Sequence, residues 1–193
     1  MRRLRMEEAA ACNGRGAALF ADGQYKEAAQ MFEAALNGCR AVLGPDHLAT
    51  LIVAGNLGVT QVAAGQKRKG LKLVADNVAD RVRVLGDDHP DTLTARDALA
   101  AAHRTAGNVD DAIAISGKVA LQRARNLGPT HPDTLTSRMG LALAHLAAGK
   151  VSTAHRLLAA ALEDAEAAYG ARHQLTLTLI KCGQAFGLIG TGA

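Results

Sequence analysis

Apolar residues recur at helical spacing along most of the chain, and no segment shows the alternation of a half-buried strand. Residues 89–128 illustrate the pattern. One apolar helical face ends at Gly107, and a second face, which includes Ile113 and Val119, ends at Gly128. Glycine commonly follows the last turn of a helix, because it adopts the left-handed backbone conformation easily. The pattern therefore predicts two antiparallel helices joined by a tight turn.

The same unit recurs with a period of 42 residues. Its signature reads LGPDHLAT from Leu43, LGDDHPDT from Leu85, LGPTHPDT from Leu127 and YGARHQLT from Tyr169. A turn glycine keeps the same period, at Gly23, Gly65, Gly107 and Gly149. A fixed period of this size marks a stack of units that bury their apolar faces on one another. The sequence therefore predicts an all-α protein, an α-solenoid of antiparallel helix pairs.

Superposition of the copies predicts about nine helices. The first helices of the pairs are expected at about 5–21, 48–63, 90–105, 132–147 and 174–189. The second helices are expected at about 24–42, 66–84, 108–126 and 150–168. We expect residues 1–193 to form a single domain of four repeats and one C-terminal helix at about 174–189. Four repeats exceed the minimum of three that a stable stack needs.

Glycine and alanine share one equivalent position in the first helices, which predicts that paired helices approach closely there. The four residues are Gly16, Gly58, Ala100 and Ala142. Other glycines inside the helices each cost about 1 kcal/mol relative to alanine and predict a rather soft stack. These are Gly55, Gly70, Gly117 and Gly140.

Two segments carry a more specific likeness, LGDDHPDTLTARDALAAAHRTAGNVDDAIAI (85–115) and LGPTHPDTLTSRMGLALAHLAAGKVSTAHRLL (127–158). They resemble the 42-residue tetratricopeptide repeat of kinesin light chains and of the bacterial proteins that share it, and the likeness covers about residues 5–189. The resemblance implies a right-handed superhelix whose first helices line a concave groove. It also implies binding of extended peptides or partner proteins in that groove, and no intrinsic catalysis.

The chain departs from this family at two positions of the first helices. Family members usually carry paired asparagines ten and nine residues before the turn glycine, where they hold the backbone of a bound peptide. Here only Asn13 and Asn56 remain, in different registers. An aromatic residue common four residues before the turn glycine is replaced by Leu19, Gln61, His103 and His145.

One face of each first helix is the expected binding surface. Positions 13, 10, 6 and 3 before the turn glycine share a helical face, which is mostly apolar but has a polar island in the third repeat. From this face and the asparagine positions we predict a partner-binding set: Asn13, Phe20, Asn56, Val59, Thr94, Asp97, Arg104, Met139 and Leu143. Two interpretations stay open. The face is an exposed interaction surface, or neighbouring repeats or a second subunit cover part of it.

Histidine is the usual metal ligand, and His47, His89, His131 and His173 recur with the repeat. Stacked repeats place equivalent residues on the order of 10 Å apart, whereas metal ligands lie about 2 Å from their ion. We therefore expect these side chains to pack and form hydrogen bonds at helix starts. No nucleophile–base spacing accompanies the other histidines, so we expect His103 and His145 to be partly buried. We expect no catalytic residue, metal or cofactor.

Composition limits the partners. The formal charge is +4, aromatic residues make up 3% of the chain, and tryptophan is absent. A nucleic-acid binder would show a basic stripe interleaved with aromatic residues. The three cysteines are widely spaced and no apolar run reaches the roughly 18 residues of a membrane span. We expect a cytoplasmic protein that binds neither nucleic acid nor membrane.

Three functions remain open. The first is a non-catalytic scaffold that binds a protein or peptide in the groove. The second is a homo-oligomeric structural module, because the segment 174–189 is rich in apolar residues and no second helix follows it; a two-fold homodimer through this helix is expected. The third is a small-molecule-binding or catalytic protein of a bacterial pathway, with Asp97, Arg104, His103 and His145 as its first candidate residues.

Overall fold

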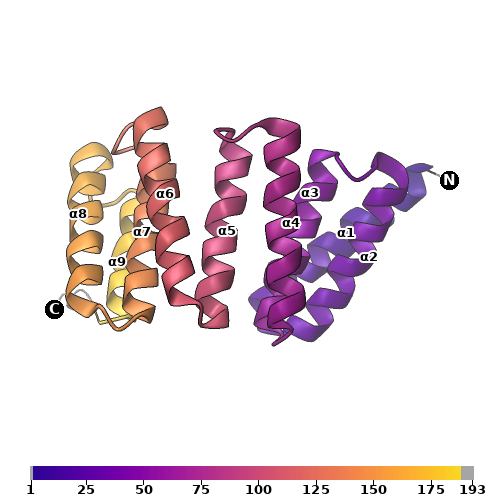
Figure 1. The fold of residues 1–193 in the computed structure, drawn as a ribbon, viewed down its shortest axis with the longest axis horizontal. Helices are drawn as coiled ribbons and strands as arrows, with labels where there is room; N and C mark the ends of the chain where they lie inside the picture. The colour runs from indigo at the N-terminus through magenta and orange to yellow at the C-terminus, as the bar shows by residue number, and fades with distance from the viewer. Residues whose placement is uncertain (1, 188–193) are drawn as a thin grey trace. The chain divides into compact units, whose positions relative to one another are not determined.

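The computed structural model describes residues 2–187, and this range contains nine helices and no strand (Figure 1). The helices are α1 (Arg2–Ala21), α2 (Tyr25–Leu43), α3 (Leu48–Ala63), α4 (Lys67–Leu85), α5 (Pro90–Ala106), α6 (Val109–Leu127), α7 (Pro132–Ala147), α8 (Val151–Tyr169) and α9 (Gln174–Ala185). The predicted all-α class and the nine helices are confirmed. The last helix, expected at about 174–189, ends earlier, at Ala185, and Phe186 caps it; residues 188 and 189 lie outside the described range.

Two compact units divide the chain, Met1–Ala106 with α1–α5 and Gly107–Ala193 with α6–α9. In the first unit each helix packs against the next, and α3 also packs against α5. One part of its core gathers Phe32, Leu36 and Leu57 from α2 and α3. The other part gathers Val62, Val74 and Ala102 from α3, α4 and α5. Alanines of α1, α2 and α3 make up half of the buried residues in the first part, so the helices lie close together there.

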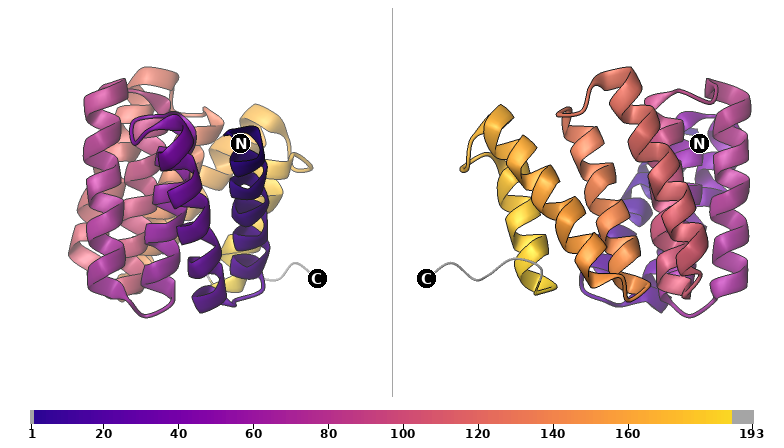
Figure 2. Two further views of the ribbon diagram at one scale, coloured as in Figure 1. Left: turned by 90° about the vertical axis from the view of Figure 1, so that its right-hand side faces the viewer. Right: turned by 60° about the vertical axis from the view of Figure 1, so that its left-hand side comes forward.

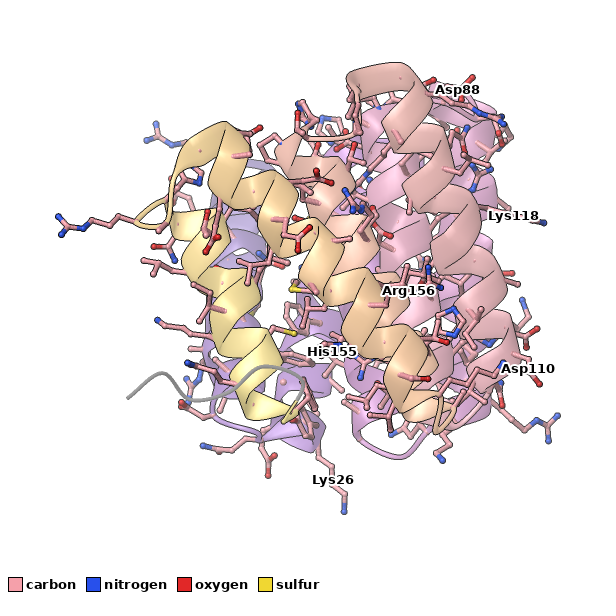
Figure 3. The ribbon with its side chains drawn as sticks, turned by 90° about the vertical axis from the view of Figure 1, so that its left-hand side faces the viewer. Lys26, Asp88, Asp110, Lys118, His155 and Arg156 are labelled. Carbon is pink, nitrogen blue, oxygen red and sulfur yellow. The ribbon has the colours of Figure 1, made fainter. Side chains whose placement is uncertain are left out.

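In the second unit α8 packs against both α7 and α9, as the right-hand view of Figure 2 shows. The core consists of Leu135, Leu158 and Leu179 with buried alanines of α7 and α8. The opposite faces of the second helices are polar. Exposed charged and polar side chains there include Asp110, Lys118, His155 and Arg156, which Figure 3 labels.

Each linker between a second helix and the following first helix, here called a long linker, contains the same two hydrogen bonds. In the second linker, Thr92 Oγ1 donates to the carbonyl oxygen of Gly86 at 2.8 Å, and His89 Nδ1 accepts from the backbone N–H of Asp91 at 3.1 Å. Equivalent threonine bonds form at Thr50, Thr134 and Thr176. Equivalent histidine bonds form at His47, His131 and His173. The expected role of these histidines at helix starts is confirmed.

The helices α3 and α4 make an especially close approach at two glycines. A Cβ added to Gly70 would lie 2.6 Å from the carbonyl oxygen of Gly58 and 2.7 Å from the backbone nitrogen of Val62. A Cβ added to Gly58 would lie 2.6 Å from Val74 Cγ2. The predicted close approach at Gly58 is confirmed. Gly70 was expected only to weaken its helix, but the structure uses it to bring the two backbones together.

Replacing Gly70 with alanine is expected to lower the free energy of unfolding by about 1–3 kcal/mol, because the new Cβ has to displace backbone atoms of α3. The intrinsic preference of helices for alanine, about 1 kcal/mol, acts in the opposite direction. Urea unfolding followed by circular dichroism measures the change. Gly14→Ala is the control, since a Cβ there meets nothing within 4 Å. We expect that variant to be slightly stabilised, and equal stability of the two variants would contradict the close approach.

A second prediction concerns the linker threonines. Thr134 is fully buried, and its hydroxyl donates to the carbonyl oxygen of Gly128 at 2.9 Å. Thr134→Val keeps the shape of the side chain and leaves this carbonyl without its donor, so a loss of about 1–2 kcal/mol is expected. The exposed Thr136 in the same helix bonds only to the carbonyl of Pro132. Thr136→Val should change the unfolding free energy by less than about 0.5 kcal/mol, as at other surface positions.

Candidate functional site

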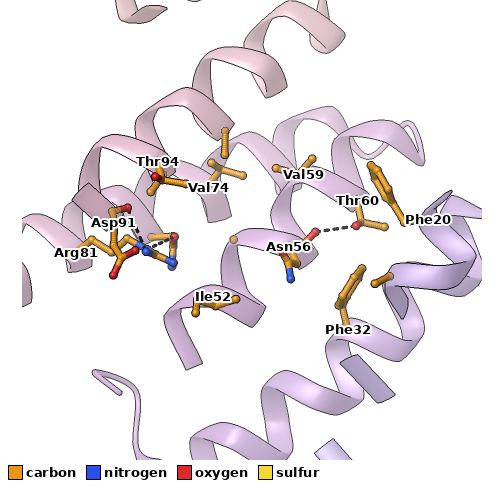
Figure 4. A pocket seen from close by; sticks show the side chains of 15 residues that line it. Phe20, Phe32, Ile52, Asn56, Val59, Thr60, Val74, Arg81, Asp91 and Thr94 are labelled. Atoms are coloured by element: carbon orange, nitrogen blue, oxygen red, sulfur yellow. Dashed lines mark hydrogen bonds between the residues drawn. The ribbon is translucent and has the colours of Figure 1, made fainter. Parts of the chain in front are cut away.

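The first unit contains a pocket with a volume of about 470 Å³, within the range of ligand-binding pockets (Figure 4). The first helices α1, α3 and α5 supply most of its walls, and α2 and α4 supply the rest. The residues from α3 are Ile52, Gly55, Asn56, Val59 and Thr60. Since side chains three and four residues apart lie on one helical face, this wall is a single surface of α3.

The structure brings together four of the nine residues predicted to bind a partner. Phe20, Asn56, Val59 and Thr94 line the pocket, and each comes from a first helix. The other predicted residues of the first unit, Asn13, Asp97 and Arg104, do not line it. Met139 and Leu143 belong to the second unit and are half-buried there. Binding of a partner by these nine residues stays a prediction.

The apolar wall is only partly exposed. Ile52 keeps 43% of its surface accessible, and Val59 and Phe20 are half-buried. Phe20 also packs edge-on against Tyr25, with ring centroids 5.2 Å apart. Val62 was expected on the same face but is only 2% exposed, because it packs between α4 and α5. Neighbouring helices therefore cover this face of α3 at Val62, while its start at Ile52 is accessible; binding of a partner there stays a prediction.

Two buried polar residues of α4 that the sequence pattern did not indicate also line the pocket. Asn77 is 3% exposed and donates through Nδ2 to the carbonyl oxygen of Leu51 at 2.7 Å. Arg81 is 6% exposed; its Nε donates to Asn77 Oδ1 at 3.2 Å and its Nη1 to the carbonyl oxygen of Asp91 at 3.1 Å. Gly55 leaves room for this arrangement, since a Cβ there would lie 3.2 Å from Asn77 Oδ1.

Burial determines the electrostatics of this end of the pocket. It lowers the pKa of Arg81, and the nearby Asp91 carboxylate raises that pKa again. An arginine remains charged under these conditions, because its ordinary pKa lies far above neutral pH. The pocket therefore combines a mostly apolar wall with one buried positive charge.

A comparison within the sequence could have revealed both residues. Arginine recurs one period later as Arg123, which is buried as well and donates to the carbonyl oxygen of Asp133 at 3.0 Å. Asn77 is the exception among its equivalents, which are Ala35, Val119 and Ala161. A polar residue at a position that is otherwise small or apolar is a signal of a local change in the core.

The remaining candidates have separate surroundings. The Thr94 hydroxyl donates to the carbonyl oxygen of Pro90 at 2.9 Å, so its own helix engages it. His103 and His145 are both half-buried, as expected. Burial, and after it the charges of Lys150 and Arg156, lowers the pKa of His145. The predicted polar island is therefore divided: Thr94 faces the pocket, while Asp97 and Arg104 lie outside its lining.

Two further features of residues 2–187 concern metals and membranes. No group of three or more histidine, cysteine, aspartate or glutamate side chains in this range is placed to hold a metal ion. In the same range, every helix is too short or too polar to cross a lipid bilayer.

Comparisons with known proteins agree with the geometry. Residues 7–75 and 106–167, more than half of the chain, match the family described as tetratricopeptide repeat. A search of curated proteins gives no match. Two crystal structures of nearly identical TPR-like repeats, described as those of a Podosopora anserina kinesin light chain, are 26% identical to the chain. Their TM-scores are 0.71, for a variant with a single substitution, and 0.70; the alignments cover 96% of this chain and 87% and 88% of those chains.

A third solved structure is BtubC (BKLC) from P. vanneervenii, with 17% identity and a TM-score of 0.68. The alignment covers 86% of this chain and 65% of that one, and at this identity the likeness concerns the fold alone. The expected resemblance to kinesin light chain repeats is confirmed by the family match and these neighbours. The chain belongs to the tetratricopeptide repeat family, in its kinesin light chain-like form.

Proposed function

We propose that the protein is a non-catalytic scaffold that binds a segment of a protein or peptide partner in the pocket of its first unit. The observation that carries this proposal is the exposure of Ile52 inside a concave surface built by α1, α3 and α5. A large aliphatic side chain left 43% exposed in a concavity, beside Val59 and Phe20, is suited to bury an apolar side chain of a partner.

The chemistry of the lining supports binding over catalysis. Among the described residues that line the pocket, the hydroxyl groups belong to Thr60 and Thr94, and both donate to carbonyl oxygens of their own helices. The lining includes one carboxylate, Asp91, and neither histidine nor cysteine. A nucleophile activated by a neighbouring base needs such a pair within hydrogen-bond reach.

Asn56 supplies the polar contact in this proposal. It is exposed on the accessible part of the wall, one turn of helix from Ile52. A side-chain amide both donates and accepts hydrogen bonds, so it can hold the N–H and C=O groups of an extended peptide. This is the role that the resemblance implies for asparagines of the first helices.

The same proposal includes the location and the class of partner. The three cysteines, Cys12, Cys39 and Cys182, are few and widely spaced in the sequence, which supports a reducing compartment such as the cytoplasm. The low aromatic content and scattered basic residues support a protein partner over nucleic acid. The bacterial origin suggested by the resemblance stays a prediction.

Ile52→Glu tests the groove. The substitution places a charge on the accessible wall while leaving the buried core unchanged, so partner capture is expected to fall at least about tenfold. Val84→Glu is the matched control, because Val84 is a β-branched residue of the same unit, 39% exposed and outside the pocket lining. Affinity capture from the native lysate with quantitative mass spectrometry compares the two variants at equal helicity. A partner retained equally by both would place the interaction elsewhere.

A homodimer through the last helix is a second part of the proposal. Within the described range of α9 and its end, Leu177 and Phe186 remain exposed, whereas Leu179 is buried against α8 and α7. We expect a two-fold contact to cover the exposed pair. Static light scattering at micromolar concentration should then give about twice the chain mass of 20.0 kDa. A monomer under these conditions would contradict the dimer without affecting the groove.

A further inference from the structure

The guanidinium of Arg81 has more donors than the protein satisfies. An arginine side chain carries five N–H donors. Two of them reach protein acceptors, one from Nε to Asn77 Oδ1 and one from Nη1 to the carbonyl oxygen of Asp91. No carboxylate of the described residues forms an ion pair with Arg81, although Asp91 lies close enough to raise its pKa. A side chain that is only 6% exposed thus brings a positive charge and three N–H groups without a protein acceptor to the pocket.

The equivalent arginine of the second unit, Arg123, has a hydroxyl acceptor that Arg81 lacks. Arg123 Nη1 donates both to the carbonyl oxygen of Asp133 at 3.0 Å and to Ser137 Oγ at 3.1 Å. One period earlier, the position of Ser137 is occupied by Ala95, which lines the pocket. The first unit therefore lacks a hydroxyl acceptor that the second unit supplies, at the place where a ligand has access.

The pocket has a polar end and an apolar end. In Figure 4 the guanidinium of Arg81 lies at one end, next to Asp91, and the rings of Phe20 and Phe32 lie at the other. Ile52 and Val59 line the space between them. A ligand that satisfies this arrangement needs an anionic group at one end and an apolar chain behind it.

We propose that the pocket of the first unit binds a small amphiphilic carboxylate, with its carboxylate on Arg81 and its apolar chain along Ile52 and Val59 toward Phe20. This ligand-binding function goes beyond the proposed partner binding and requires no protein partner, but both occupants would use the same wall of the pocket and so exclude each other. The volume of about 470 Å³ suits a small molecule of this kind.

The charge balance favours a carboxylate over a more highly charged group. The planar guanidinium matches the two oxygens of a carboxylate, and such paired bonds are among the strongest hydrogen bonds in proteins. The Asp91 carboxylate beside Arg81 keeps 40% of its side chain exposed to solvent, so the buried guanidinium can still take one further negative charge. A dianion such as a phosphate monoester would bring a second charge close to the Asp91 carboxylate, where burial and like-charge repulsion oppose it.

Calorimetric titration of the purified chain with hexanoate, octanoate and decanoate tests the proposal. We expect saturable binding that strengthens with chain length, because each added methylene buries more apolar surface. Nonyltrimethylammonium, which has the nine-carbon tail of decanoate with a cationic head, is expected not to bind in the pocket. Equal binding of both amphiphiles, or no binding of any carboxylate below its micelle concentration, would overturn the proposal.

Two substitutions link the binding to Arg81. Arg81→Met removes the charge and is expected to weaken decanoate binding about 10- to 100-fold, as for a lost hydrogen-bonded charge pair. Ala95→Ser supplies the hydroxyl acceptor seen beside Arg123 and is expected to weaken binding by about two- to tenfold, with little effect on the fold. If Arg81→Met fails to fold, the decanoate affinity of Ala95→Ser alone tests whether the carboxylate contacts Arg81.

Arg123→Met is the matched control, since Arg123 occupies the equivalent position of the second unit and does not line the pocket. It should bind decanoate like the unmodified chain. Decanoate affinity unchanged in both Arg81→Met and Ala95→Ser, or lowered equally in Arg123→Met, would show that the carboxylate does not contact Arg81. Loss of carboxylate binding with intact partner capture would separate this proposal from the proposed scaffold function.

Discussion

A buried hydroxyl bond in each long linker is the constraint on which the helix stack depends. The threonine near the start of each following first helix donates to the carbonyl of the glycine that ends the preceding second helix, as Thr92 does to Gly86. The carbonyl would otherwise lose its partner on burial, at a cost of about 1–3 kcal/mol. Because that glycine has a positive φ of 96° at Gly86, the chain can reverse direction within a few residues. The two features together fix how one pair follows another.

Most of the fold could be predicted because the repeat imposes the same boundary signals many times. Glycines at the helix ends and the linker signature predicted the helix limits to within a few residues. Because each boundary recurs in several copies, an atypical residue in one copy hardly changed the predicted limits. Gly70 shows the limit of this approach. Its contact with the backbone of Gly58 depends on the distance between two helices, which no pattern in a single helix reveals.

The site could be predicted only in part, for the same physical reason. Phe20, Asn56, Val59 and Thr94 lie on the expected face and do meet at one pocket. Asn77 and Arg81 come from a second helix, where charged and amide side chains normally point to solvent. Burying a guanidinium costs several kcal/mol unless its donors are satisfied. Here Asn77, itself held by Leu51, and the carbonyl of Asp91 accept two of the five donors of Arg81, which offsets only part of this cost.

The uniform linker has a consequence for how such an array changes over generations. Since the junctions at Gly44, Gly86 and Gly128 use the same bonds, a duplication or deletion of one whole period would join ends that already fit each other. Array length is therefore easy to vary by recombination. The pocket has no such freedom, because its lining comes from three successive first helices and from Asn77, which occurs in one copy only. Gain or loss of a repeat within that stretch would keep a folded chain and remove this pocket.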